Sequence, residues 1–199
     1  MACTLCPLHS AFDPKNPCIP SKRVGKRAPK KVVFVLGQSP GKTEDDEDEV
    51  FVGDSGAMLK EGMAAAGITD YTVGNPVRCF VKSGVSMKPA WLKACRPYLE
   101  GDLERLGFGQ KDGVERYILA LGNEALFSTM RRRNILEAES KEQWSEELNA
   151  WVYPLRHPAA VLRAMGEKTS WMLNFKRFGK LVRGELTDKP PVTWSMVTA

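Results

Sequence analysis

The stretch Lys31-Val-Val-Phe-Val-Leu-Gly37 decides the fold of this chain. A continuous apolar run that is rich in valine and ends in glycine is typical of a strand buried on both faces. Three more stretches have this character: Tyr71-Thr-Val-Gly-Asn75, Tyr117-Ile-Leu-Ala-Leu-Gly122 and Trp151-Val-Tyr-Pro-Leu155. Helical periodicity appears between and after them, at about 54–67, 89–107, 125–130, 158–162 and 170–181.

Strands that alternate with helices predict an α/β fold. We expect a three-layer sandwich in which helices flank a central four-stranded parallel sheet. Functional residues of such sheets lie at the carboxyl ends of the strands, so the loops beginning at Gly37, Asn75, Gly122 and His157 are the candidates for the site. A chain of 199 residues that is 43% hydrophobic has room for one domain. We expect that domain to cover 1–183, with an irregular segment at 1–29 that needs a staple and an extended or mobile tail at 184–199.

The basic residues favour a polyanionic partner. The net charge is +5, and the basic side chains gather in three groups. Such groups bind phosphates, although solvated surface is the plain alternative. The six consecutive acidic residues 44–49 would repel DNA, and we expect them to form a solvated loop. The groups are Lys22, Arg23, Lys26, Arg27, Lys30 and Lys31; Arg131, Arg132 and Arg133; and Lys168, Lys176, Arg177, Lys180 and Arg183.

The sequence gives no sign of a membrane or secretory protein. It has no run of about 18 apolar residues. It also begins without an apolar segment behind a basic start. We therefore expect an intracellular, cytoplasmic protein.

The five cysteines predict a metal or cluster site. Cys3 and Cys6 form a close pair able to chelate, and an intracellular protein does not normally hold such thiols as disulfides. A zinc ribbon would need a second close pair, yet Cys79 and Cys95 lie sixteen residues apart. Two close and two distant thiolates suit a [4Fe–4S] cluster that fastens an irregular N-terminus. From spacing alone, zinc, an iron–sulfur cluster and unrelated buried thiols all stay open.

Short motifs at the strand ends carry a resemblance to one family. Taken together and in order, they resemble the motifs of the family 4, iron–sulfur uracil-DNA glycosylases over residues 3 to about 181. Each motif alone occurs by chance, whereas their order, their spacing and four cysteines together are specific. The motifs are Gly37-Gln-Ser-Pro-Gly41 with Glu44-Asp45, Phe51-Val-Gly53 with Ser55-Gly56, Asn75-Pro-Val-Arg-Cys79, Leu121-Gly122-Asn-Glu-Ala125 and His157-Pro-Ala-Ala-Val-Leu-Arg163.

The resemblance implies an enzyme of base-excision repair. It would hydrolyse the N-glycosidic bond of uracil flipped out of DNA, with DNA as its partner and the protein as a monomer. It also implies that the [4Fe–4S] cluster is held by Cys3, Cys6, Cys79 and Cys95, which leaves Cys18 as the spare thiol.

The resemblance also implies roles for the motif residues. Asn75 would donate to O4 of uracil and accept from N3–H, and Phe51 would stack on the ring. His157 would stabilise the departing base at O2. The plain alternatives are a turn-capping asparagine, a core phenylalanine and a turn histidine. The backbones of Gly37 and Gly41 would approach the sugar and the base closely, and Arg163 would face the minor groove or a phosphate.

Gln38 departs from the family pattern, which has glutamate there to orient or deprotonate the attacking water. An amide can hold water but cannot take its proton. We take Gln38 and Glu44, with His157, as the candidate catalytic residues. Two alternatives follow from the change. One is a weak or inactive glycosylase fold retained as a DNA-binding subunit with a replication or repair protein as partner, and the other is a glycosylase for another modified pyrimidine.

Overall fold

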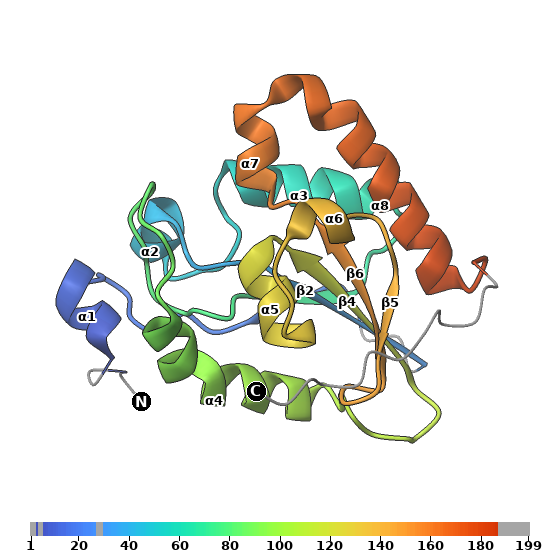
Figure 1. The fold of residues 1–199 in the computed structure, drawn as a ribbon, viewed down its shortest axis with the longest axis horizontal. Coiled ribbons are helices and arrows are strands. Elements are labelled where there is room, and N and C mark those ends of the chain that lie inside the picture. The colour runs from blue at the N-terminus through green and yellow to red at the C-terminus, as the bar shows by residue number, and fades with distance from the viewer. Residues whose placement is uncertain (1–2, 4–5, 27–29, 187–199) are drawn as a thin grey trace.

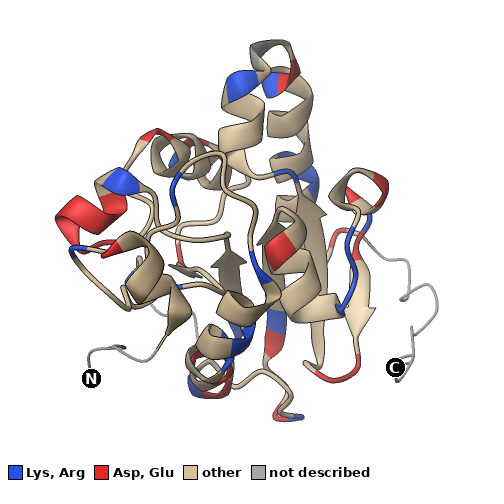
Figure 2. Ribbon diagram, turned by 60° about the vertical axis from the view of Figure 1, so that its left-hand side comes forward, with Lys and Arg blue, Asp and Glu red and all other residues tan. Residues whose placement is uncertain are grey.

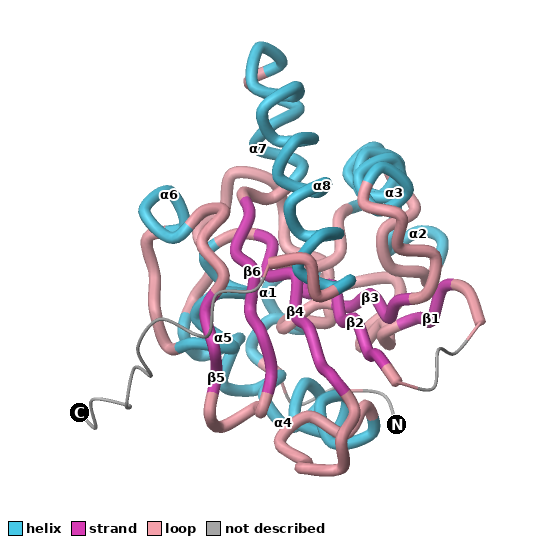
Figure 3. The backbone as a smooth tube through the Cα atoms, turned by 90° about the vertical axis from the view of Figure 1, so that its right-hand side faces the viewer, coloured by secondary structure: helices cyan, strands magenta, loops and turns pink. Residues whose placement is uncertain are grey.

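A six-stranded sheet lies at the centre of the computed structural model, which describes residues 3, 6–26 and 30–186 (Figure 1). The strand order is β1-β3-β2-β4-β6-β5, as Figure 3 shows. The four predicted strands β3, β2, β4 and β6 are parallel neighbours, which confirms the expected parallel core. The short strands β1 and β5 add an antiparallel edge on each side. The bounds are β1 (Lys22–Val24), β2 (Lys31–Leu36), β3 (Tyr71–Gly74), β4 (Glu115–Leu121), β5 (Gln143–Ser145) and β6 (Ala150–Leu155).

Helices cover both faces of the sheet, so the three predicted layers are present (Figure 1). Alternate residues of β2 show this, because Val33 and Val35 pack with one group of helices while Phe34 and Leu36 pack with the other. The first group is α3 (Asp54–Ala65), α7 (Pro158–Arg163) and α8 (Lys168–Arg183), and the second is α4 (Pro89–Arg105) and α5 (Asn123–Met130). Short helices complete the described part: α1 (Pro7–Phe12), α2 (Lys42–Glu47), α6 (Ile135–Ala138) and a 3-10 turn at Met165–Glu167.

The strand register brings the four predicted loops to one level. Leu36 of β2 lies opposite Gly74 of β3 and Ala120 of β4. Leu121 in turn lies opposite Leu155 of β6. The loops that follow these positions therefore leave the sheet side by side at its carboxyl edge. β3 and β4 are the two neighbours of β2, so the chain crosses to opposite sides of β2 at this edge.

Residues 44–47 of the acidic run are helical, so the prediction of a loop was wrong for them, whereas Asp48 and Glu49 lie in the turn that follows. Residues of the run make up most of α2, which appears red in Figure 2. Asp45 is 2% exposed because its carboxylate accepts the backbone N–H groups of Lys15 and Asn16, each at 3.0 Å. One acid of the run therefore anchors the N-terminal segment, a role that composition does not reveal.

The N-terminal segment is also more ordered than predicted. Helix α1 begins after Cys6, whose thiol accepts the N–H of Leu8 at 3.4 Å, and β1 pairs with β3. Elements of six and three residues are too short to give a readable periodicity. At the other end, α8 ends at Gly184 in the left-handed region, and the expected tail lies outside the described residues from 187 onwards.

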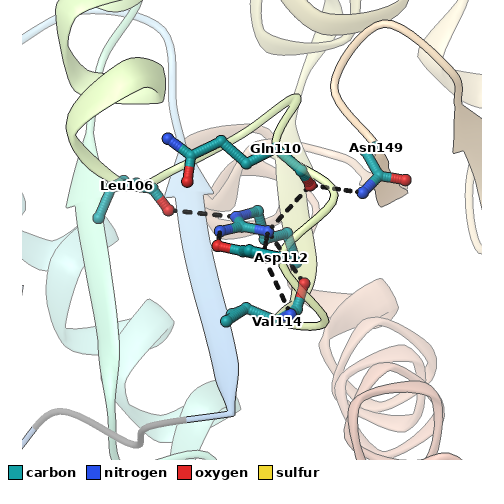
Figure 4. A network of polar contacts seen from close by, with 6 residues as sticks. Leu106, Gln110, Asp112, Val114 and Asn149 are labelled. Atoms are coloured by element: carbon teal, nitrogen blue, oxygen red, sulfur yellow. Dashed lines mark hydrogen bonds and ion pairs between the residues drawn. The ribbon is translucent and has the colours of Figure 1, made fainter.

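A buried arginine near the start of β4 binds the loop that precedes this strand, and Figure 4 shows the partners Leu106, Gln110, Asp112 and Val114. Arg116 is 4% exposed and donates to the carbonyls of Leu106, Gln110 and Val114 and to both oxygens of Asp112. This pairing holds the pKa of the Asp112 carboxyl well below its usual range.

No helix within residues 6–26 and 30–186 has the length and apolar character needed to cross a membrane.

Candidate active site

A cavity of about 570 Å³ opens at the carboxyl edge of the sheet and is lined by all four predicted loops. Its volume lies within the range of about 300–1,000 Å³ that is common for ligand sites. Every residue predicted for the pocket lines the cavity except Gly37, which lies behind the lining residues Asn75 and Phe51. The lining residues from that prediction are Gln38, Gly41, Glu44, Phe51, Asn75, His157 and Arg163.

Asn75 offers the cavity an unused hydrogen-bond acceptor. It follows β3 and is only 6% exposed. Within the described part of the chain, its buried Oδ1 has no hydrogen-bond partner. A buried acceptor left unpaired costs about 1–3 kcal/mol, so such an atom in a cavity wall points to a ligand that donates to it.

Gly37 leaves the room that Asn75 and Phe51 occupy. A Cβ atom on Gly37 would lie 2.4 Å from Oδ1 of Asn75 and 2.6 Å from Cζ of Phe51. Phe51 itself has a φ of 57°, in the left-handed region that is strained for an aromatic residue. Its carbonyl lies against Gly56, where a Cβ would approach to 1.8 Å. Both glycines therefore serve to place the phenylalanine ring and the amide at the cavity wall.

His157 is held as a neutral hydrogen-bond donor. It is the N-cap of α7, and its Nδ1 accepts the backbone N–H of Ala159 at 3.2 Å. Burial, with the positive charge of Arg163 nearby, lowers the pKa of His157 from 6.5 to about 4. Because Nδ1 is an acceptor, the ring proton lies on Nε2. The ring centroid of His157 is 6.3 Å from that of Phe51, so both rings belong to one side of the site.

Glu44 braces the first two motifs against each other. Its Oε2 accepts the N–H of Gly41 at 3.0 Å, and its Oε1 accepts the N–H of Gly53 at 3.2 Å. Gln38 is fixed through its backbone, whose carbonyl accepts the N–H of Val77 at 3.3 Å. Among the described residues, none makes a hydrogen bond to the half-buried side chain of Gln38, which lines the cavity.

The order of these motifs matches one family. Residues 24–176 match the model of the uracil DNA glycosylase superfamily. The chain belongs to this superfamily. It is 27% identical to the type-4 uracil-DNA glycosylase of Archaeoglobus fulgidus over 195 residues. This alignment covers 91% of this chain and 88% of that protein. The chain is 30% identical to the type-4 uracil-DNA glycosylase of Pyrobaculum aerophilum over 170 residues, an alignment that covers 81% of this chain and 80% of that protein.

This superfamily member has further cavity residues that the motif analysis missed. Lys82 and Val85 come from the loop before α4, and Leu136 comes from α6. Arg156 directly precedes His157, and its guanidinium is paired with Glu139 at 2.9 Å. Arg156 could have been found from its place directly after β6, whereas Lys82, Val85 and Leu136 lie several residues from any strand end and in segments too short to show a periodicity.

The cysteines of this glycosylase-family chain gather beside α4. Cys6, Cys79 and Cys95 are buried in one cluster against which Cys3 packs. Burial raises the pKa of the Cys79 thiol to about 11 and that of Cys95 to about 12. Cys18 adjoins them, since its backbone N–H donates to Sγ of Cys79 at 3.3 Å. Across the described ranges, no three side chains of Cys, His, Asp or Glu are arranged to hold a single metal ion.

Many of the basic side chains are paired with carboxylates. In the first group, Lys22 pairs with Glu49 and Arg23 with Asp70. Members of the third group pair in the same way, at Lys168–Glu61, Arg177–Glu142 and Arg183–Glu185. At the cavity, by contrast, Lys82 and Arg163 have no carboxylate partner among the residues that the structure describes. The cations best placed for a polyanion are therefore those at the cavity mouth.

Proposed function

We propose that this protein hydrolyses the N-glycosidic bond of uracil flipped out of DNA. The observation that carries the proposal is the unpaired, buried Oδ1 of Asn75 in the cavity wall. Uracil presents an N3–H donor to that oxygen and an O4 acceptor to the amide N–H. Both curated relatives described above are named as type-4 uracil-DNA glycosylases.

Asn75 would also reject cytosine. Cytosine has an acceptor at N3 and an amino donor at C4, so each edge atom would meet the wrong atom of the amide. The backbone of Gly37 lies close to Oδ1 of Asn75, because a Cβ on Gly37 would be only 2.4 Å from that oxygen. Leaving buried polar groups unpaired is the strongest form of discrimination available to such a site.

His157 would stabilise the base as it leaves. Cleavage gives the base negative charge and the sugar oxocarbenium character. A neutral imidazole with its proton on Nε2 donates a hydrogen bond to the developing anion at O2. The lowered pKa of His157 supports this role, because the ring stays neutral at physiological pH. Phe51 would hold the base by stacking, since its ring lies at the same wall.

Gln38 would orient the attacking water without taking its proton. Its amide lines the cavity, whereas Glu44 accepts two backbone N–H groups. A general base contributes about 10²- to 10⁴-fold. The reaction would therefore be slower than with a carboxylate at position 38, although a largely dissociative cleavage needs little assistance from water.

A [4Fe–4S] cluster fits the cysteines. Cys6, Cys79 and Cys95 lie in one apolar core group against which Cys3 packs, and the N–H groups of Leu8 and Cys18 donate to the sulfurs of Cys6 and Cys79. Each N–H group stabilises a thiolate, the ligand form, and so offsets part of the burial that raises the pKa of Cys79. We propose Cys3, Cys6, Cys79 and Cys95 as ligands. When bound, the cluster supplies a covalent staple between the N-terminal segment and the body.

Excision of uracil from oligonucleotides tests the proposal. The protein is incubated with single-stranded and duplex DNA that contains one uracil, and abasic sites are then cleaved with alkali. We expect cleavage by wild type and its loss in Asn75→Ala, with Asn174→Ala on α8 as the matched control. Binding of DNA without any cleavage would overturn the proposal and favour the DNA-binding subunit, the alternative that Gln38 supports.

A further inference from the structure

A second, smaller cavity lies behind Phe51. Its volume is about 200 Å³, and among the described residues only Phe51 lines both this cavity and the larger one. It is formed between α3 and the edge of the sheet that contains β1 and β3, as these elements are arranged in Figure 3. An apolar cavity of about 150 Å³ holds a benzene molecule, so this cavity has room for a single ring.

The walls of the small cavity are mostly apolar. β1 contributes Val24, β3 contributes Val73 and α3 contributes Leu59. Val50 and Phe51 form the side that faces the larger cavity. Four of these five residues are buried in the main core and Val24 packs against it, so the space between them is held open by the fold. Such walls favour an occupant with an apolar body.

Tyr71 adds a polar group to these walls. It lines the cavity from β3 and is 6% exposed. Within the part of the chain that the structure describes, its phenol makes no hydrogen bond. Burial raises the pKa of Tyr71, so the phenol stays protonated and remains a donor. An occupant that accepts a hydrogen bond would satisfy it.

The mouth of the small cavity carries a free positive charge. Lys22 and Arg23 line the cavity but are paired with Glu49 and Asp70. Lys60 of α3 also lines it and is exposed, and it has no carboxylate partner within residues 6–26 and 30–186. A free ammonium group beside an apolar cavity attracts an anion.

We propose that the cavity behind Phe51 binds a small organic carboxylate that carries one aromatic ring. The ring would occupy the apolar part, and the carboxylate would accept the phenol O–H of Tyr71 and pair with Lys60. Phe51 has a φ of 57° and separates the two cavities, so the occupant would support its ring on the side away from the larger cavity. This site is independent of uracil excision.

Titration of the protein with benzoate, followed by methyl NMR, tests the proposal. We expect saturable shifts at Val24, Leu59 and Val73, and none at Val81 and Val85, which line the larger cavity. Benzamide, the neutral analogue, should bind about two- to fivefold more weakly, the factor that one exposed ion pair is worth. Acetate has no ring and should cause no saturable shift.

Substitutions at the two polar contacts give a second test. Lys60→Met should remove the difference in affinity between benzoate and benzamide. Tyr71→Phe keeps the ring and should weaken benzoate about two- to tenfold, the factor of one hydrogen bond. Lys176→Met removes an exposed lysine of α8 that lines neither cavity, and it should bind benzoate as wild type does.

The outcomes that would overturn the proposal are distinct. Shifts confined to Val81 and Val85, or displacement of benzoate by free uracil, would place the ligand in the larger cavity. Equal affinity for benzoate and benzamide in wild type would refute the carboxylate, and the absence of any saturable shift would show that only water fills the small cavity. None of these results bears on uracil excision, which the oligonucleotide assay tests by itself.

Discussion

Replacing Gly37 with alanine should damage uracil recognition while leaving the fold intact. The added Cβ would lie 2.4 Å from Oδ1 of Asn75 and 2.6 Å from Cζ of Phe51, so both side chains must move. The backbone at Gly37 does not have a positive φ, and the effect is therefore steric and confined to the cavity wall.

The size of the effect follows from the contacts that would be displaced. Two hydrogen bonds from the Asn75 amide to uracil contribute about 0.5–1.5 kcal/mol each. Stacking of one base on an aromatic ring contributes about 1–3 kcal/mol, of which part remains if Phe51 only tilts. A loss of about 2–4 kcal/mol corresponds to a fall of about 30- to 1,000-fold in the single-turnover rate.

The assay is single-turnover excision from a uracil oligonucleotide, with thermal unfolding measured in parallel. Gly101→Ala is the matched control, because Gly101 lies in α4 and a Cβ there meets nothing within 4 Å. The control should keep full activity and gain about 0.5–1 kcal/mol of stability, since alanine is the better helix former. A Gly37→Ala protein as active as wild type would refute the placement of Asn75 and Phe51 at the base.

Gln38→Glu should raise the single-turnover rate at least about tenfold if the rest of the site is in place, and an unchanged rate would show that position 38 does not act on water. The pKa of His157 is lowered from 6.5 to about 4, so its ring should titrate below pH 5 when followed by NMR. The free energy of unfolding should fall as the pH drops from 6.5 towards 4, because in this range only the unfolded chain takes up the proton. His157→Asn should remove that part of the pH dependence and lower the excision rate by about 10²–10³. Iron analysis should find about four irons per chain, retained in Cys18→Ser and lost in Cys79→Ser, whereas zinc without iron in anaerobically purified protein would contradict the cluster. Arg116→Met should lower the free energy of unfolding by about 2–4 kcal/mol, because the carbonyls of Leu106 and Val114 lose the guanidinium donor and that of Gln110 keeps only Asn149. Uracil excision should be unchanged in the folded protein.

The sequence by itself determined the parallel core of the sheet and the edge at which the site lies. Strands buried on both faces need continuous apolar runs, and the run 31–36 and its three counterparts have them. The carboxyl ends of parallel strands necessarily meet at one edge, so the motifs after Leu36, Gly74 and Leu155 had to converge there. The short edge strands and α2 escaped prediction, because three to six residues hold no readable period.

Only the tertiary structure decided what the site residues can do. Oδ1 of Asn75 is buried without a hydrogen-bond partner among the described residues, and it lies beside Gly37, which is distant from it in sequence. His157 is neutral because the folded chain desolvates its half-buried ring and places Arg163 nearby. Burial, pairing and exposure depend on which loops meet across the edge of the sheet. No local pattern records that meeting, and so the small cavity behind Phe51 became visible only in the folded chain.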